Sequence, residues 1–189
     1  LGLAMAPIAQ REKIPFLVAQ AGVPGIADVG DFVYRTTTTE GEYYEAMLQT
    51  LVDQGAETTS RLYASDNETS AVLAKETIPP LADKVGLEIL DTVSFKGTDT
   101  DFSQVATKVT EGGPDSVGII GNGPAVSSSI TALRNAGFDG ALFGGSGMGA
   151  GALASIGDDA KDAYYPSSFI PAADLPWQIA GATIGRLTP

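Results

Sequence analysis

Ser116–Gly121, which reads SVGIIG, is a short and almost wholly apolar run between two turn signals, Pro114-Asp115 before it and Asn122-Gly123-Pro124 after it. A strand that is apolar at successive positions is buried on both faces, as in a parallel sheet. The next segment, Ala125–Ala136, has apolar residues at helical spacing and ends at Gly137, which indicates a helix that covers one of those faces. The pattern predicts an α/β fold, a parallel sheet flanked by helices.

The same alternation of short strands and helices continues in both directions along the chain. A helix that begins near Thr38 or Thr39 is expected to be capped there, with Glu42 in its first turn, and to end at Gly55. A later helix is expected to break or kink at Pro79-Pro80, because proline removes a hydrogen-bond donor. The predicted strands are Pro15–Ala19, Phe32–Thr36, Ser60–Ala64, Glu88–Phe95, Ala141–Gly144 and Ala163–Ser167, and the predicted helices are Leu1–Lys13, Thr39–Gln54, Thr69–Val85, Asp101–Glu111 and Ala150–Ile156.

Composition excludes several classes of function. The 189 residues include no Cys and no His, which excludes thiol catalysis, zinc fingers and histidine-based triads. The formal net charge is −12, and the 11 basic residues are scattered, so no nucleic-acid partner is expected. No apolar run approaches the roughly 20 residues of a membrane-spanning helix, so no membrane insertion is expected. The apolar start, residues 1–9, is predicted to be a helix already under way rather than a signal peptide, because no basic segment precedes it.

Small polar residues follow four of the predicted strands. In open α/β sheets, ligands bind outside the carboxyl ends of the strands, and small residues let backbone N–H groups approach a polar ligand. One such loop is ordinary turn chemistry, but four together predict a shared cleft. The four segments are Gln20-Ala21-Gly22, Ser65-Asp66-Asn67, Gly121-Asn122-Gly123-Pro124 and Gly144-Gly145-Ser146-Gly147.

Two motifs suggest other chemistry. Gly147–Ala152 (GMGAGA) matches the dinucleotide fingerprint if Ala replaces its third Gly, but the acidic residue expected about 20 positions later is absent. A nucleotide- or NAD-binding Rossmann-type enzyme is therefore kept as the alternative. Asp99 and Asp101 have the spacing of a calcium loop without the rest of its ligands, so Asp101 is expected to cap a helix. No spacing of carboxylates or hydroxyls predicts a catalytic site.

The order of several short segments resembles a known family. Together they resemble the leucine/isoleucine/valine-type (type I) periplasmic binding proteins, the amino-acid/amide-type solute-binding components of ABC importers. The segments are Ala6–Ala9 (APIA), Ile14–Leu17 (IPFL), Asp31–Thr36 (DFVYRT), Thr100–Ser103 (TDFS), Pro114–Val117 (PDSV), Leu133–Gly137 (LRNAG) and Gly157–Ala160 (GDDA) followed by Tyr164-Tyr165.

The resemblance implies two α/β lobes, one of them incomplete. Residues 1–37 would be the C-terminal part of lobe 1, residues 38–166 would be lobe 2, and residues 167–189 would cross back toward lobe 1. The family's ligand positions fall on Gln20, Ala21 and Gly22 in lobe 1, and on Asn67, Thr69, Asn122, Gly123, Ser146 and Met148 in lobe 2.

Two of these positions depart from the family's pattern. Gly22 stands where a Thr is usual, so only backbone contacts carry over. Ser146 stands where amino-acid binders have an acidic residue, and a hydroxyl cannot offset the desolvation of a buried ammonium as a carboxylate does. The resemblance therefore disfavours an α-amino acid and favours a carboxylate, amide or aromatic acid as the ligand.

The function that the resemblance implies is non-enzymatic capture of a small polar molecule by hinge closure. The ligand would be an amino acid, an amide or an aromatic or organic acid, held without a cofactor or metal. The protein would be extracytoplasmic (periplasmic or extracellular), monomeric, and would deliver its ligand to the permease of an ABC transporter. A ligand-binding domain of a receptor, built on the same fold, is a further alternative.

Overall fold

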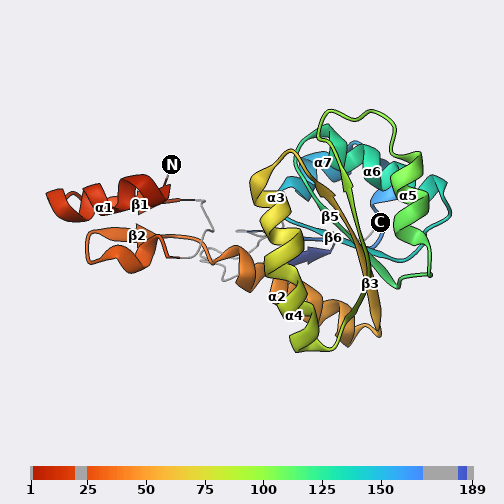
Figure 1. Ribbon diagram of the computed structural model, residues 1–189, viewed down its shortest axis with the longest axis horizontal. Helices are drawn as coiled ribbons and strands as arrows, with labels where there is room; N and C mark the ends of the chain where they lie inside the picture. The colour runs from red at the N-terminus through yellow and green to blue at the C-terminus, as the bar shows by residue number, and fades with distance from the viewer. Residues whose placement is uncertain (1, 20–24, 168–182, 187–189) are drawn as a thin grey trace, which may run out of the picture. The chain divides into compact units, whose positions relative to one another are not determined.

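The chain folds as two compact units, and the predicted α/β class is confirmed (Figure 1). The computed structural model describes residues 2–19, 25–167 and 183–186. The smaller unit includes the described residues up to Tyr43. Its elements are α1 (Gly2–Glu12), β1 (Phe16–Val18), the 3-10 turn η1 (Ala27–Val29) and β2 (Val33–Arg35). β1 and β2 pair in parallel.

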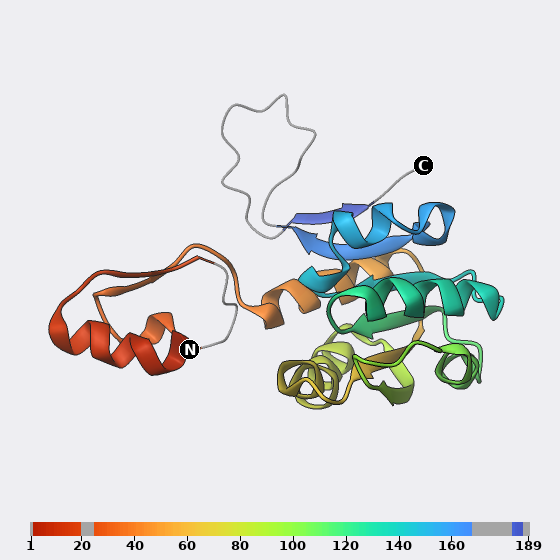
Figure 2. The ribbon, with the colours of Figure 1, turned by 90° about the horizontal axis from the view of Figure 1, so that it is seen from above.

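The larger unit is built around a six-stranded sheet with the order β4-β3-β5-β6-β7-β8 (Figure 2). The four pairs from β4 to β7 are parallel. Its strands are β3 (Thr58–Ala64), β4 (Glu88–Phe95), β5 (Ser116–Ile120), β6 (Ala141–Gly144), β7 (Ala163–Ser167) and β8 (Thr183–Arg186). The helical elements are α2 (Glu40–Asp53), α3 (Glu68–Val72), the π-helical turn η2 (Leu73–Thr77), α4 (Ile78–Val85), α5 (Ser103–Thr110), α6 (Pro124–Asn135), the 3-10 turn η3 (Ser146–Met148), α7 (Ala150–Ala154) and the 3-10 turn η4 (Gly157–Ala160).

The inner strands β3, β5 and β6 are buried on both faces, as their continuous apolar runs predict, whereas the edge strand β4 has exposed residues. Successive side chains of a strand point to opposite faces, so Leu142 of β6 packs in one core while Phe143 packs in the other. One core lies between the sheet and α5, α6 and α7, and the other lies between the sheet and α2, α3 and α4. The sheet is thus the middle layer of three.

The amino end of the sheet is held by a carboxylate. Asp115 Oδ2 accepts hydrogen bonds from the N–H of Glu57 (2.9 Å), the N–H of Thr58 (2.9 Å) and the hydroxyl of Thr58 (2.8 Å). These donors lower the pKa of Asp115. Because they tie the start of β3 to the start of β5, they explain why β3 begins at Thr58, two residues before the predicted strand.

Helix ends follow the predicted signals. Thr39 and Glu42 form a capping box at the start of α2: the Thr39 hydroxyl accepts the Glu42 N–H at 3.3 Å, and Glu42 Oε2 accepts the Thr39 N–H at 2.7 Å. Gly55 follows α2 with a φ of +94°, which glycine adopts without a Cβ penalty. Asp101 accepts the N–H of Ser103, the first residue of α5, at 2.9 Å, but it stands one residue before the N-cap Phe102 rather than at the predicted N-cap position.

The interruption between α3 and α4 lies earlier than the predicted kink at Pro79-Pro80. Both prolines stand in the first turn of α4, and the irregular turn is the π-helical η2 before them. Proline has no N–H to donate to the carbonyl four residues back. We attribute the wider π-helical turn to the loss of those two donors.

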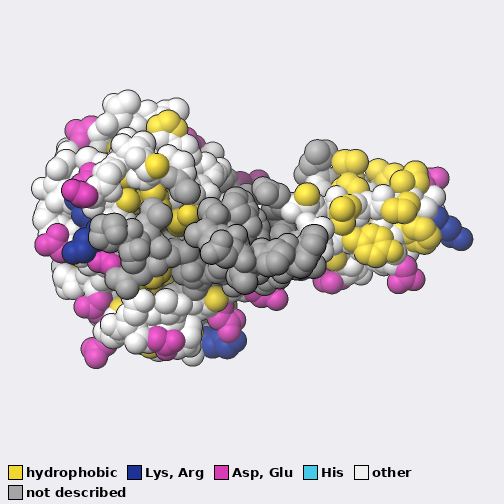
Figure 3. Space-filling model, turned by 180° about the vertical axis from the view of Figure 1, so that it is seen from behind, with side chains coloured by type: hydrophobic (Ala, Val, Ile, Leu, Met, Phe, Trp, Pro, Cys, Tyr) yellow, Lys and Arg dark blue, Asp and Glu magenta, His cyan; other side chains and the backbone are white. Residues whose placement is uncertain are grey.

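The smaller unit carries an apolar surface (Figure 3). Six of the eight large apolar side chains that are exposed among the described residues belong to this unit. Leu17 of β1 and Tyr34 of β2 are register partners and are 63% and 53% exposed. One face of the two-stranded sheet therefore packs on α1 while the other is uncovered.

Arg134, near the end of α6, joins three segments at the amino end of the sheet. Its guanidinium donates to the carbonyl oxygens of Phe138 (2.7 Å), Gly140 (3.0 Å) and Asp159 (3.2 Å), and to that of Lys161. Replacement of Arg134 by Lys keeps the charge but removes the planar fork that reaches several carbonyls. We expect the free energy of unfolding in urea to fall by about 1–3 kcal/mol.

The matched control for Arg134 is Arg11→Lys. Arg11 pairs with Glu12 on the surface, where its side chain is 71% exposed, so this change is expected to stay within about 0.5 kcal/mol. Equal effects of the two substitutions would contradict the role of Arg134.

Arg61 of β3 is a buried cation that lacks a carboxylate partner among the described residues. It is 4% exposed, and its Nη2 donates to the Thr92 hydroxyl at 2.6 Å. Its Nε and Nη1 have no partner within the described part of the chain, and burial lowers the pKa of the guanidinium to about 10. A buried charge without compensation destabilises the folded state.

Arg61→Met is therefore expected to raise the free energy of unfolding by about 1–4 kcal/mol, because it replaces the buried charge by an apolar side chain of similar length. Chemical denaturation at pH 7 measures the change. A loss of stability in this variant would show that Arg61 is compensated in the folded protein.

Candidate functional site

The carboxyl edge of the larger sheet brings together three of the four predicted loops. β3, β5 and β6 are neighbours and run parallel, so the segments that follow them leave the sheet at the same edge. These segments contain Asn67 and Thr69 after β3, Asn122 and Gly123 after β5, and Ser146 and Met148 after β6. The fourth predicted loop, Gln20-Ala21-Gly22, lies outside the described residues.

The loop after β3 is fixed by its own polar side chains. Asp66 accepts the N–H of Gly97 with Oδ1 at 2.9 Å and Oδ2 at 3.1 Å, and the Ser65 hydroxyl donates to the carbonyl of Phe95 at 3.0 Å. Both bonds tie this loop to the end of β4. Asn67 caps α3 by accepting the Ser70 N–H at 3.1 Å. With its oxygen engaged, Asn67 offers the two N–H groups of its amide.

The loops after β5 and β6 are in close contact. A methyl group on Gly147 would lie 2.3 Å from the carbonyl oxygen of Gly121 and 2.6 Å from Oδ1 of Asn122. Glycine is therefore required at 147 for the two loops to approach. Asn122 and Gly123 are exposed at the start of α6, and Ser146 is exposed in η3.

Met148 differs from the other described candidates because its side chain lies in the core. It is 1% exposed and belongs to the core between the sheet and α5–α7. A methyl group on Gly144 would lie 2.9 Å from its Cε. The structure thus gives this side chain a packing role, whereas Asn67, Thr69, Asn122 and Ser146 present polar groups that are at least partly exposed.

The loops after β5 and β6 offer neutral hydrogen-bonding groups rather than a carboxylate. In the segment after β3, both oxygens of Asp66 accept the Gly97 N–H, and Glu68 is exposed as the first residue of α3. Amide, hydroxyl and backbone N–H groups suit a ligand that carries a carboxylate or amide, which they can bind by donating hydrogen bonds.

Tyr44 and Gly97 contribute to this edge but were missed in the sequence. The Tyr44 hydroxyl lies 3.0 Å from where a Cβ on Gly145 would be, so α2 abuts the loop after β6. Gly97 is 31 residues from Asp66 in the sequence. A local sequence pattern does not predict a contact between residues so far apart.

The glycine-rich segment 147–152 does not form the helix that a dinucleotide site uses. α7 has five residues. Gly147 packs against Gly121 and Asn122, where the loops after β5 and β6 meet. A dinucleotide site places its pyrophosphate at the start of a helix that packs along a strand. These features favour the solute-binding interpretation over the enzyme alternative.

Comparisons with known proteins agree with the resemblance in the sequence. The family model described as "Periplasmic binding protein" matches residues 1–180. A search of curated proteins found no match.

Several solved structures of binding proteins are similar to this chain over most of its length. A leucine binding protein, LivK, from Thermotoga maritima is 24% identical with a TM-score of 0.77 over 93% of this chain and 50% of its own. A solute binding protein of an ABC transporter from R. palustris, in complex with benzoate, is 18% identical with a TM-score of 0.75 over 92% and 48%. The branched-chain amino acid substrate binding protein LivJ from Streptococcus pneumoniae, in complex with isoleucine, is 18% identical with a TM-score of 0.74 over 91% and 49%. The chain spans about half the length of these structures.

The contact between the two loops generates a matched pair of substitutions. Gly147→Ala would place a methyl group against Gly121 and Asn122, so we expect it to lower the free energy of unfolding by about 1–3 kcal/mol. Gly151→Ala adds a methyl group in α7 that meets nothing within 4 Å, and it is expected to be neutral or stabilising by up to about 1 kcal/mol. Thermal denaturation distinguishes the two, and a neutral Gly147→Ala would contradict the close packing.

Proposed function

The chain belongs to the periplasmic binding protein family, and from that premise we propose that it is part of the solute-binding protein of an ABC importer, which captures a small polar molecule between two lobes by hinge closure. The observation that carries the proposal is the family match over residues 1–180. The parallel sheet with exposed amide and hydroxyl groups at its carboxyl edge supports it, because ligands of open α/β sheets bind there. The captured molecule would pass to a membrane permease.

The two units correspond in this proposal to parts of the two lobes. Residues 1–37 are assigned to the C-terminal part of lobe 1, residues 38–166 to lobe 2, and residues 167–189 to the segment that returns toward lobe 1. Within this last segment, β8 adds a strand to the sheet of the larger unit. The uncovered sheet face at Leu17 and Tyr34 supports the first assignment, because parallel sheets are normally covered on both faces. Further elements of lobe 1 would cover these two side chains.

The proposed ligand carries a carboxylate or amide and lacks an ammonium group. Segments 121–123 and 145–149 contain no acidic residue, and Asp66 is engaged by Gly97, so neither the loops after β5 and β6 nor Asp66 offers a carboxylate to an ammonium. Asn67, Thr69, Asn122, Gly123 and Ser146 are proposed to contact the ligand from lobe 2, with Gln20, Ala21 and Gly22 contacting it from lobe 1. For Met148, we propose that only backbone atoms contact the ligand, because its side chain lies in the core.

The protein is proposed to hold its ligand without chemical change and to work outside the cytoplasm. The absence of His and Cys from the sequence supports a binding role, because it removes the commonest general bases and thiol nucleophiles. Family membership supports an extracytoplasmic location. No helix in the described part of the chain is long and apolar enough to cross a membrane.

A thermal-shift panel tests the ligand class. Benzoate, 4-hydroxybenzoate, short amides, leucine and NAD are each added to the full chain. A ligand at 100 times its Kd adds about 2.7 kcal/mol to the free energy of unfolding. We expect an aromatic acid or an amide to raise Tm more than leucine does, since the loops after β5 and β6 contain no carboxylate to pair with an ammonium. A response to NAD alone would contradict the proposal.

Ser146→Glu provides the reciprocal test of the same site. A carboxylate at 146 is expected to weaken the response to an aromatic acid by charge repulsion and to strengthen the response to leucine. The control is Ser155→Glu, the same substitution at an exposed serine after α7, which is expected to change neither response. An unchanged ligand profile in Ser146→Glu would show that residue 146 lies outside the site.

A further inference from the structure

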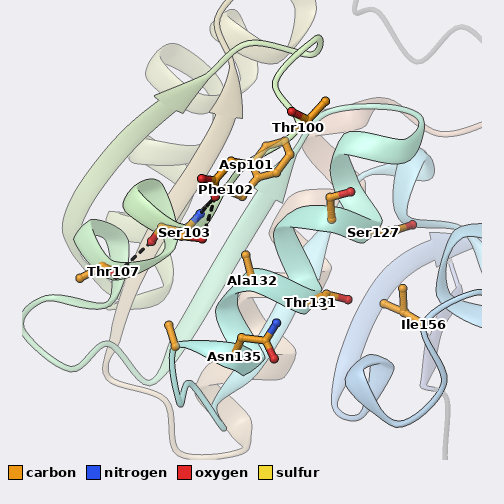
Figure 4. Close-up of a pocket in the computed structure, with 12 residues that line it drawn as sticks. Thr100, Asp101, Phe102, Ser103, Thr107, Ser127, Thr131, Ala132, Asn135 and Ile156 are labelled. Atoms are coloured by element: carbon orange, nitrogen blue, oxygen red, sulfur yellow. Dashed lines mark hydrogen bonds between the residues drawn. The ribbon is translucent and has the colours of Figure 1, made fainter.

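A second recess lies on the larger unit, away from the predicted ligand residues. It is a groove of about 580 Å³ between α5 and α6, bounded by the loop before α5 and by Ile156 (Figure 4). None of the nine predicted ligand residues lines it. Its walls combine polar and apolar surface, and the polar side chains include Asp101, Ser103, Thr107, Ser127, Thr131 and Asn135.

Four hydroxyl groups of this groove each donate a hydrogen bond to another group of the protein. A hydroxyl has one proton and two lone pairs, so each of these oxygens can only accept a hydrogen bond from a ligand. The four donations are Ser103 Oγ to Asp101 Oδ1 (2.7 Å), Thr107 Oγ1 to the Ser103 carbonyl (2.9 Å), Ser127 Oγ to the Ala152 carbonyl (3.2 Å) and Thr131 Oγ1 to Asp159 Oδ2 (2.8 Å).

The charge of the groove, like its hydrogen-bonding groups, favours a ligand that donates hydrogen bonds and is positively charged. No Lys or Arg is among the residues that line it, and Asp101 is. The hydroxyl and N–H of Ser103 lower the pKa of Asp101, which keeps it ionised. The start of α5 would otherwise favour an anion, but its first N–H already points at Asp101. The groove therefore presents acceptors and negative charge.

Apolar surface separates the polar groups. Ala132 and Ala136 of α6 and Ile156 beyond it also line the groove, and they can contact methylene groups. From this alternation we propose that the groove binds a linear alkyl diamine or polyamine. One ammonium group would be held by Asp101 and the hydroxyls of α5, the alkyl chain would lie over the alanines, and a second ammonium would be held by Thr131 and Asn135.

The test is a titration of the full chain with spermidine and putrescine at low ionic strength, followed by calorimetry and by amide chemical shifts. Asp101→Asn keeps a side-chain oxygen that can accept the N–H of Ser103, but it removes the charge. It is expected to weaken spermidine binding about five- to twentyfold. Asp83→Asn removes the same charge from exposed Asp83 on α4, across the sheet, and is expected to change the Kd by less than about twofold.

A second variant tests the shape of the groove. Ser128 is exposed on α6 and lines the groove, so Ser128→Phe would fill it without disturbing the core. We expect this variant to keep the Tm and to lose spermidine binding, with wild-type shift changes confined to α5, α6 and their flanking loops. Equal weakening by Asp101→Asn and Asp83→Asn, no spermidine binding, or binding of inorganic phosphate at these residues would overturn the proposal. Because none of these substitutions changes a predicted ligand residue, the aromatic-acid response reports on the proposed function separately.

Discussion

Parallel pairing of β3, β5 and β6, with an apolar layer on each face, is the constraint on which the larger unit depends. Parallel strands need a crossover between them, and here each crossover contains a helix that covers one face. The same direction of the strands brings every following loop to one edge. The location of the candidate site is therefore a consequence of how the sheet is buried.

The two edges of this sheet are built differently. At the amino edge, Asp115 and Arg134 bind several backbone groups each and join the starts of neighbouring strands. At the carboxyl edge, Asp66 holds one loop and a glycine contact holds two others, which leaves Asn67, Asn122 and Ser146 with exposed polar groups. Strong ties at one edge thus allow small polar residues at the other.

Much of the fold was predictable because burial leaves a periodic trace in the sequence. The predicted strands 88–95, 141–144 and 163–167 agree with the observed bounds. β3 begins at Thr58, two residues before the prediction, because its first residues are polar and are held by Asp115 from a distant segment. The π-helical turn was not predicted either. A proline predicts an irregularity in the helix, but it does not fix which turn is irregular.

The sequence predicted the edge of the sheet at which the candidate site lies, but it did not predict the contacts that its residues make. Strand ends followed by small residues indicated the edge, but the core position of Met148 depends on how η3 turns back over β6. The tie between Asp66 and Gly97 depends on two loops that are far apart in sequence. Such features follow from tertiary packing, and a local pattern does not carry them.

An amide chemical-shift map of the protein tests the central claim most directly. The titrant is the compound of the panel that raises Tm most. If the carboxyl edge captures the solute, the largest changes will fall at Asn67, Thr69, Asn122 and Ser146, with the amino-edge residues Asp115 and Arg134 unchanged. Changes that cluster elsewhere and spare those four residues would contradict the account.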